Sequence, residues 1–173
     1  MGNNGWYVGN VTITTLGVDS ISSPVTCTPV QSQTTDTAGS VFDGSCTNDA
    51  GLTMDAMPLT IMRDATAPVV AVTGVPNGAV YQLGAVPAVG CSTTDAVSGV
   101  ETSAVLSLSG GPVGSITAAC SGAKDNAGNA GQASVTFNVA YNWTGFFQPV
   151  DNPGSTITPL FNQVKAGRSI PVK

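Results

Sequence analysis

The chain has 173 residues, of which 9% are charged and 42% are hydrophobic, and it carries a net charge of −5 without a single histidine. So little charge excludes a coiled coil or a charged disordered tail, and the acidic balance argues against nucleic acid as a partner, because a nucleic-acid binder needs a basic surface. The apolar runs are far shorter than the roughly 20 residues that cross a bilayer, so we expect no membrane insertion.

Short alternating segments rich in Val, Thr, Ile and Ser follow one another along the chain, and few windows have helical spacing. Such alternation is typical of strands that are buried on one face. In chain order, the predicted strands are Val11–Val18, Val25–Thr28, Leu59–Ile61, Val69–Thr73, Val105–Leu108 and Ser134–Val139. Turn signals rich in Gly, Asp and Asn separate them, at 19–20, 76–78, 98–99, 110–112 and 126–129. This pattern predicts an all-β fold of the β-sandwich type.

Four cysteines, Cys27, Cys46, Cys91 and Cys120, are spaced too widely for a C-x-x-C metal or redox motif. Four cysteines allow three pairings. We expect the local pairing, Cys27–Cys46 with Cys91–Cys120, because it gives one bridge to each half of the chain. Disulfides persist in oxidising compartments, so this pairing predicts a protein that works outside the cytoplasm. The alternative is four buried free thiols that pack as small hydrophobic side chains.

The chain repeats itself with a period of about 75 residues. Cys46–Gly51 resembles Cys120–Asn129, because each cysteine precedes a polar turn that contains Asp-Ala-Gly or Asp-Asn-Ala-Gly. Upstream, Val18–Val25 matches Thr94–Val100. The repeat therefore predicts two copies of one β-rich unit.

The two copies differ in the position of their first cysteine. Cys91 precedes the turn that contains Asp95, whereas Cys27 follows the corresponding turn at Asp19. The first cysteines should therefore lie on neighbouring strands. Each should still reach the same late strand of its copy, where a disulfide requires Cα atoms within about 7 Å.

The repeat predicts two domains, residues 1–64 and 65–140, with a joint at Arg63–Pro68 that has no apolar pattern. From Tyr141 the composition changes, and we interpret residues 141–173 as a connector and the first strands of a truncated third module. No signal peptide is visible, and both ends have the pattern of a cut chain. We expect a fragment of a longer secreted protein.

These residues also carry a resemblance to a known family. Asn4–Tyr7 followed by Val11–Thr14 is similar to the opening strands of bacterial immunoglobulin-like repeats in secreted and cell-surface proteins. Arg63–Pro68 resembles the joint between such repeats, and Gly90–Val100 and Cys120–Asn129 resemble their internal turns.

The stretch 141–173 is similar to the entry into the PxKF domain of actinobacterial and related extracellular proteins. The chain stops at Pro171-Val172-Lys173, before the Phe of the Pro-x-Lys-Phe motif. The resemblance implies two tandem immunoglobulin-like Greek-key sandwiches that act as extracellular spacers or adhesion modules beside neighbouring domains of the same protein. It implies no particular activity. The first copy departs from the pattern, because it lacks the closing Asn that Asn129 supplies in the second.

Catalytic groups have no evident arrangement in this sequence. A Ser or Thr nucleophile needs an activating base, and the chain has neither a histidine nor a suitably placed lysine. The carboxylates are scattered and Glu101 is the only glutamate, whereas a glycosidase holds an acid and a base in one cleft. We therefore expect a protein that is not an enzyme.

Oxygen-bearing side chains at the predicted turns are candidates for a calcium site, and they are Asp64, Asp95, Asp125, Asn126 and Asn129. Calcium takes 6–8 oxygen ligands, and Asp64 would contribute from the joint. The spacing is not that of a calcium loop with alternating acids. Asp and Asn also cap their own turns by accepting hydrogen bonds from nearby N–H groups, which is the interpretation that we favour. We expect no cofactor other than this possible calcium ion.

The aromatic residues Tyr141, Trp143, Phe146 and Phe147 are candidates for binding carbohydrate or a cell-surface glycan, a hypothesis that Trp6 and Tyr7 also allow. We favour the alternative that the four later residues pack between the second and third modules. A third hypothesis is self-assembly, in which the C-terminal segment adds a strand to the sheet edge of another copy.

Overall fold

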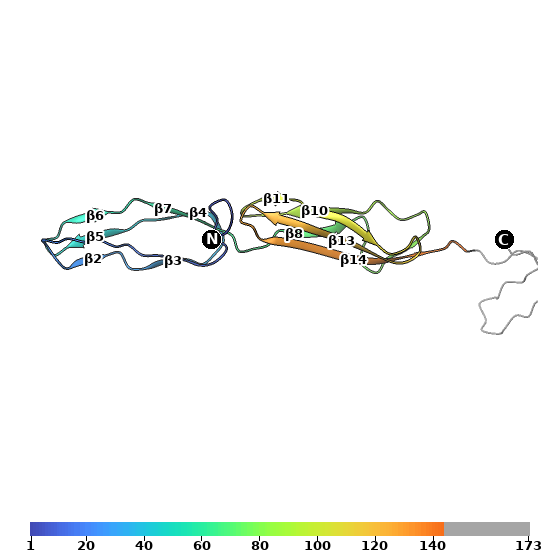
Figure 1. Cartoon of the computed structure of the whole chain (residues 1–173), viewed down its shortest axis with the longest axis horizontal. Helices are drawn as coiled ribbons and strands as arrows, with labels where there is room; N and C mark the ends of the chain where they lie inside the picture. The colour runs from blue at the N-terminus through green and yellow to red at the C-terminus, as the bar shows by residue number, and fades with distance from the viewer. Residues whose placement is uncertain (144–173) are drawn as a thin grey trace, which may run out of the picture.

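The computed structural model describes residues 1–143, and that range consists of β-strands and connecting turns without a helix. Figure 1 shows the strands as two elongated groups that lie end to end, with the N-terminus at the junction between them. In the described range, strands before residue 64 pair only with one another, and so do the strands after it. We call these the N-terminal group, β1–β7, and the C-terminal group, β8–β14. The predicted all-β class is confirmed.

The N-terminal group contains short strands, and their bounds are β1 (Val11–Ile13), β2 (Val25–Cys27), β3 (Gln31–Gln33), β4 (Thr37–Phe42), β5 (Ser45–Asn48), β6 (Thr53–Asp55) and β7 (Leu59–Arg63). They form antiparallel sheets in the orders β1-β3, β2-β5-β6 and β4-β7. Tyr7 adds a parallel bridge to Arg63, so the start of the chain lies beside the last strand of its group.

The C-terminal group contains longer strands, and their bounds are β8 (Val69–Thr73), β9 (Val80–Gln82), β10 (Gly90–Thr94), β11 (Val100–Thr102), β12 (Val105–Ser109), β13 (Gly114–Asp125) and β14 (Ala130–Ala140). β8 and β10 form one antiparallel sheet. β13 and β14 form a long hairpin to which β11, β12 and β9 add, and β9 runs parallel to β14. β8 contacts β13 and β14, so the two sheets of this group pack together.

The apolar core that the structure shows lies in the C-terminal group. Its buried centre is Val75, Ala118, Phe137 and Val139. The ring of Tyr81 meets Phe137 edge-on at 5.9 Å between ring centroids. In the N-terminal group, among the described residues, the buried hydrophobic side chains are only Trp6 and Ile61. Burial of apolar surface is the main favourable term in folding, so the N-terminal group depends more on its other constraints.

The predicted strand Val11–Val18 is longer than the observed β1, which ends at Ile13. Residues 14–18 pair with no strand of the described range. The alternation predicts which side chains share a face, but a strand also needs a neighbour with which to exchange backbone hydrogen bonds. Within residues 1–143 no such neighbour pairs with residues 14–18, and the regular strand ends at Ile13.

The structure joins Cys27 on β2 to Cys46 on β5, and Cys91 on β10 to Cys120 on β13. This is the expected local pairing, and it leaves no free cysteine. Cys27 lies on β2, after the turn at Asp19, whereas Cys91 lies on β10, before the turn at Asp95. The first cysteine therefore has a different position in each group, as the sequence predicts. Two disulfides are typical of proteins outside the cytoplasm. Residues 1–143 hold no helix with the length and apolar character to cross a membrane.

Replacement of Cys27 and Cys46 by alanine should destabilise the N-terminal group by about 2–4 kcal/mol, because the bridge limits the unfolded chain and little apolar core compensates for its loss. The measurement is urea unfolding followed by the fluorescence of Trp6, the only tryptophan of that group. The matched control replaces Cys91 and Cys120, and it should leave the Trp6 transition in place. An unchanged Trp6 transition in the first variant would contradict the prediction.

Candidate functional site

The junction between the two groups is held by the buried side chain of Asp64. Its main-chain N–H donates to the carbonyl of Tyr7 at 2.9 Å, which fixes Asp64 to the N-terminal group. Its carboxylate accepts hydrogen bonds from the N–H groups of Thr66 and Ser98, each at 3.0 Å. Ser98 belongs to the C-terminal group, so one carboxylate contacts both sides of the junction. We call Arg63–Pro68 and the turns that contact it the joint.

Two turns of the C-terminal group meet the joint, and each is capped by an aspartate. Asp95 Oδ1 accepts from the N–H of Gly99 at 2.7 Å. Asp125 Oδ1 accepts from the N–H groups of Gly128 and Asn129 at 2.7 and 2.8 Å, and its other oxygen accepts from the amide of Asn129 at 2.7 Å. These bonds are the turn capping that we favoured from the sequence.

The asparagines of the second turn bind the N-terminal side of the joint. The amide nitrogen of Asn129 donates to the main-chain carbonyls of Asp64 and Thr66 at 3.0 and 3.2 Å. The carbonyl of Asn126 accepts from the side chain of Asn4 at 3.1 Å. Asn4 lies at the start of the chain, far from Asn126 in the sequence. Two connections therefore hold the joint, the covalent linker and the contact with the first residues of the chain.

The first residues of the chain form this second contact. The N–H of Asn3 donates to the carbonyl of Ala127 at 2.9 Å, and the N–H of Gly2 donates to the carbonyl of Trp6 at 2.9 Å. The side chain of Trp6 is 8% exposed. Residues 2–6 therefore form a small turn, which is anchored by a buried indole and rests on the end of the C-terminal group.

Asp36, from the connection between β3 and β4, fastens the other side of the joint. Its carboxylate accepts from the guanidinium of Arg63, from the N–H of Ala65 at 3.0 Å and from the hydroxyl of Thr66. The hydroxyl of Thr66 lowers the pKa of Asp36 most, the N–H of Ala65 lowers it further, and the positive charge of Arg63 adds to the effect. The carboxylate therefore stays ionised at neutral pH. Asp36 was not among the residues expected from the sequence, because nothing in the pattern relates it to residues about thirty positions later.

Three of the predicted calcium candidates are brought together at the joint. Asp64, Asp95 and Asp125 each offer a carboxylate oxygen, and these atoms lie within 4.8 Å of one another. Oxygens that bind one calcium ion at 2.3–2.6 Å lie at most about 5 Å apart, so the spacing fits a shared ion. Asp64 and Asp125 are wholly buried. Within residues 1–143, Asp95 Oδ2 is the one oxygen of the three carboxylates without a hydrogen bond.

The remaining candidates have different positions. The amide nitrogens of Asn126 and Asn129 donate hydrogen bonds to main-chain carbonyls of the joint. These side chains therefore hold the segments around the carboxylate cluster in position. Tyr141 and Trp143 are exposed, at 66% and 63%. Phe146 and Phe147, with the rest of the predicted third module, lie outside the described residues. The buried Trp6 offers no ring face to a sugar.

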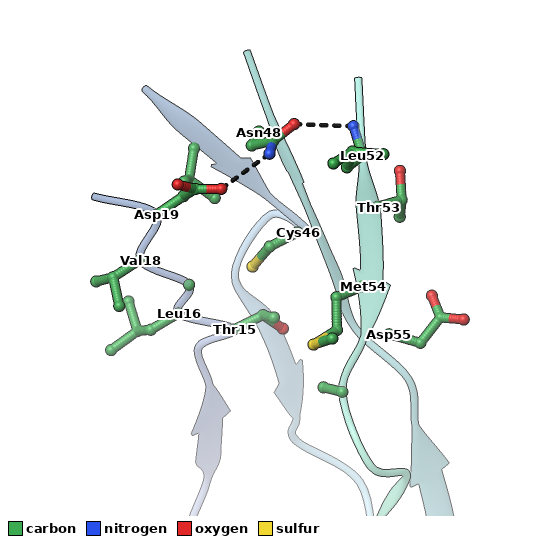
Figure 2. A pocket seen from close by; sticks show the side chains of 13 residues that line it. Thr15, Leu16, Val18, Asp19, Cys46, Asn48, Leu52, Thr53, Met54 and Asp55 are labelled. Carbon is green, nitrogen blue, oxygen red and sulfur yellow. Dashed lines mark hydrogen bonds between the residues drawn. The ribbon is translucent and has the colours of Figure 1, made fainter. Parts of the chain in front are cut away.

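A second candidate site is a groove of about 510 Å³ at the end of the N-terminal group that faces away from the joint. Figure 2 shows residues 15–19 along one side of it, β6 along the other and Cys46 of β5 between them. Asn48 closes one end, because it donates to Asp19 Oδ2 at 2.9 Å and accepts from the N–H of Leu52 at 2.8 Å.

Apolar side chains and backbone atoms form most of the lining of this groove. Its titratable side chains are the carboxylates of Asp19 and Asp55. The amide of Asn48 lowers the pKa of Asp19 most, and N–H groups of the turn that follows lower it further. Asp19 is thus an ionised turn cap. The groove offers surface for a ligand to pack against.

Comparison with known proteins finds no family model, no curated protein and no solved structure that matches this chain.

The joint should weaken in acid through Asp36. The folded-state pKa of Asp36 lies below the unfolded value of about 4, so its hydrogen bonds stabilise the fold above that pH and are lost as pH falls through the folded pKa. Asp36→Asn should therefore flatten the dependence of the unfolding midpoint on pH below about 4. The measurement is thermal unfolding from pH 7 to pH 2.

Asp43→Asn is the matched control, because it removes the same charge from an exposed position of the N-terminal group. It should keep the acid dependence of the original chain. Equal profiles for the two variants would show that Asp36 is not the group responsible.

Proposed function

We propose that this chain is a non-enzymatic spacer of an extracellular protein, secreted or attached to the cell surface. In this proposal, residues 1–64 and 65–140 are two immunoglobulin-like Greek-key sandwiches that stand end to end and hold neighbouring domains apart. The observation that supports the spacer most is the joint, where buried Asp64 is bonded to both strand groups. The two disulfides support a location outside the cytoplasm.

A spacer needs a joint that resists bending. Small contacts between domains usually permit relative motion, and a short linker alone would act as a hinge. Here Asp64, Asn129 and the Asn3–Asn4 segment bind across the junction at separate points. Each hydrogen bond contributes only about 0.5–1.5 kcal/mol, but bonds at separate points restrain the angle as well as the distance.

Loss of Asn129 should make the joint bend. Asn129→Ala removes the donor that reaches two carbonyls of the linker. Spin labels on added cysteines at Val41 and Val105, one exposed position in each group, would report the distance between the groups. The distance distribution should be narrow in the original chain and clearly broader in the variant.

Asn77→Ala is the matched control. Asn77 also makes a hydrogen bond through its side chain, accepting from the N–H of Thr136, but it lies in a different turn, between β8 and β9. The control should keep the narrow distribution. A broad distribution in the unaltered chain would contradict the rigid spacer.

The carboxylate cluster favours a second function for the same joint, the binding of a calcium ion that stiffens it. Three carboxylates repel one another when they share a small space, unless a cation or protons compensate. In the described range, the one ion pair is Arg63 with Asp36, so no cationic side chain compensates Asp64, Asp95 or Asp125. Asp95 Oδ2 offers an oxygen that has no other partner among residues 1–143.

Calcium should bind with a dissociation constant on the order of 10⁻⁴ to 10⁻³ M, the range of extracellular modules, and should raise the unfolding temperature. Asp95→Asn should weaken binding about tenfold or more, because the amide keeps the oxygen that caps the turn and loses the charge. Calorimetry and thermal unfolding would measure both effects.

Asp49→Asn, on an exposed turn of the N-terminal group, is the charge-matched control and should bind calcium as the original chain does. Without a heat of binding or a thermal shift in the original chain at about 10 mM calcium, the three carboxylates serve only as hydrogen-bond acceptors at the joint.

A further inference from the structure

This chain contains an asparagine followed by a glycine at two places, Asn4-Gly5 and Asn77-Gly78. Such an asparagine loses ammonia from its side chain more readily than others, because glycine leaves its own main-chain nitrogen unshielded and the backbone free to turn. All four residues are exposed, so exposure does not distinguish the two places. The hydrogen bonds of the groups that would react do distinguish them.

The dipeptide Asn77-Gly78 lies in the turn before β9 and is fastened to β14. The N–H of Gly78 donates to the carbonyl of Thr136 at 2.7 Å, and the side-chain oxygen of Asn77 accepts from the N–H of Thr136 at 2.9 Å. The next residue, Ala79, accepts from the N–H of Asn138 at 2.8 Å. The nitrogen of Gly78 therefore reaches the side chain of Asn77 only after bonds to the sheet have broken.

The dipeptide Asn4-Gly5 lies in the small turn of residues 2–6 at the joint, and its reacting groups are less restrained. Within residues 1–143, neither the N–H of Gly5 nor the side-chain oxygen of Asn4 has a hydrogen-bond partner. The side-chain nitrogen of Asn4 donates one bond, to the carbonyl of Asn126 at 3.1 Å. A single exposed hydrogen bond thus restrains the amide that would be lost.

The backbone at Asn4 is strained. Its φ is 53°, and among residues 1–143 it is the one residue other than glycine with a positive φ. In this left-handed conformation the Cβ is crowded against a carbonyl oxygen, a contact that glycine avoids. Opening of the turn lets Asn4 leave the strained conformation, so the strain favours the open state from which the side chain can react.

We propose that Asn4 is a site of spontaneous deamidation, the hydrolysis of its side-chain amide, and that this modification releases the joint. In the first step, the main-chain nitrogen of Gly5 attacks Cγ of Asn4. The proton of that nitrogen passes through solvent to the leaving side-chain nitrogen, which departs as ammonia, and a five-membered succinimide ring remains.

In the second step, water adds to one of the two ring carbonyls and the ring C–N bond opens. The product at position 4 is aspartate or isoaspartate, in which the main chain runs through the former side-chain carbonyl and is one atom longer. Water is the co-reactant, and the oxidation state of every atom is unchanged. Because ammonia leaves, the change proceeds in one direction, and the joint passes from stiff to loose as the protein ages.

Both products remove a contact of the joint. An ionised carboxylate has no hydrogen to donate, so the carbonyl of Asn126 loses its donor and faces an oxygen instead. Isoaspartate also inserts its extra atom into a turn that is closed by the bond from the N–H of Gly2 to the carbonyl of Trp6. The neighbouring bond from Asn3 to Ala127 then loses its support. This consequence rests on the proposed spacer function, whereas the deamidation itself does not.

The first test keeps the full chain in buffer at neutral pH and follows each asparagine by peptide mapping with mass spectrometry, which detects the replacement of an amide by a carboxyl group. Asn4 should convert at least about tenfold faster than Asn77, because two hydrogen bonds must open before Gly78 can react. A synthetic peptide of residues 2–8 gives the rate without the fold. Conversion of Asn77 as fast as that of Asn4 would overturn the assignment, and so would an intact Asn4 after the peptide has fully converted.

A second test links the reaction to the joint through the distance between spin labels at positions 41 and 105. The distribution in the aged original chain should be clearly broader than in the fresh chain. Asn4→Gln should stop the change with age, because its longer side chain would have to close a less favourable six-membered ring. Equal broadening of fresh and aged Asn4→Gln samples would show that age acts elsewhere.

A matched pair of variants isolates the lost donor. Asn4→Asp creates one of the two products directly and should broaden the distribution without ageing. Asn3→Asp adds the same charge one residue earlier, at an exposed side chain that makes no hydrogen bond within residues 1–143, and it should keep the distribution narrow. A narrow distribution in Asn4→Asp would overturn the release of the joint.

Failure of this inference can be told apart from failure of the spacer function. A broad distribution in the fresh original chain would count against the rigid spacer, and the rates at Asn4 and Asn77 would still decide the deamidation. A narrow distribution in the fresh chain with an unreactive Asn4 would leave the spacer intact and overturn this inference alone.

Discussion

The buried carboxylate of Asp64 is the interaction on which the arrangement of this protein depends. It accepts hydrogen bonds from Thr66 in the linker and from Ser98 beyond it, while its own N–H is held by Tyr7. A buried carboxylate is costly unless its oxygens are bonded. The linker, the first residues of the chain and the turn around Ser98 must therefore all be in place together, and the two strand groups meet in a defined way.

The two strand groups use one turn geometry for different purposes. At the joint, Asp95 and Asp125 cap their turns beside Asp64, and the carboxylates gather. At the opposite end of the N-terminal group, Asn48 replaces the second aspartate and donates directly to Asp19. One end thus gathers three carboxylates, and the other pairs one carboxylate with an amide beside the groove.

Among the described residues, the N-terminal group buries fewer apolar side chains than the C-terminal group. The C-terminal group encloses Phe137 and Val139 with the help of β8, whereas the N-terminal group encloses Trp6 and Ile61 and leaves residues along its groove exposed. Among residues 1–143, no strand pairs with residues 14–18, which form one wall of the groove. The disulfide between Cys27 and Cys46 and the contacts of Trp6 at the joint gain importance because of the smaller apolar burial.

Alternation, turn residues and cysteine spacing are local features, and from them we predicted the all-β class and the turns at Asp19 and Asp95 and expected the local disulfide pairing. The sequence also marked Asp64, Asp95 and Asp125 as oxygen donors. The convergence of these carboxylates, the bonds of Asp36 to the linker and the lack of a strand within residues 1–143 that pairs with residues 14–18 are visible only in the folded chain. Each of those facts depends on contacts between segments far apart in the chain, which no local pattern records.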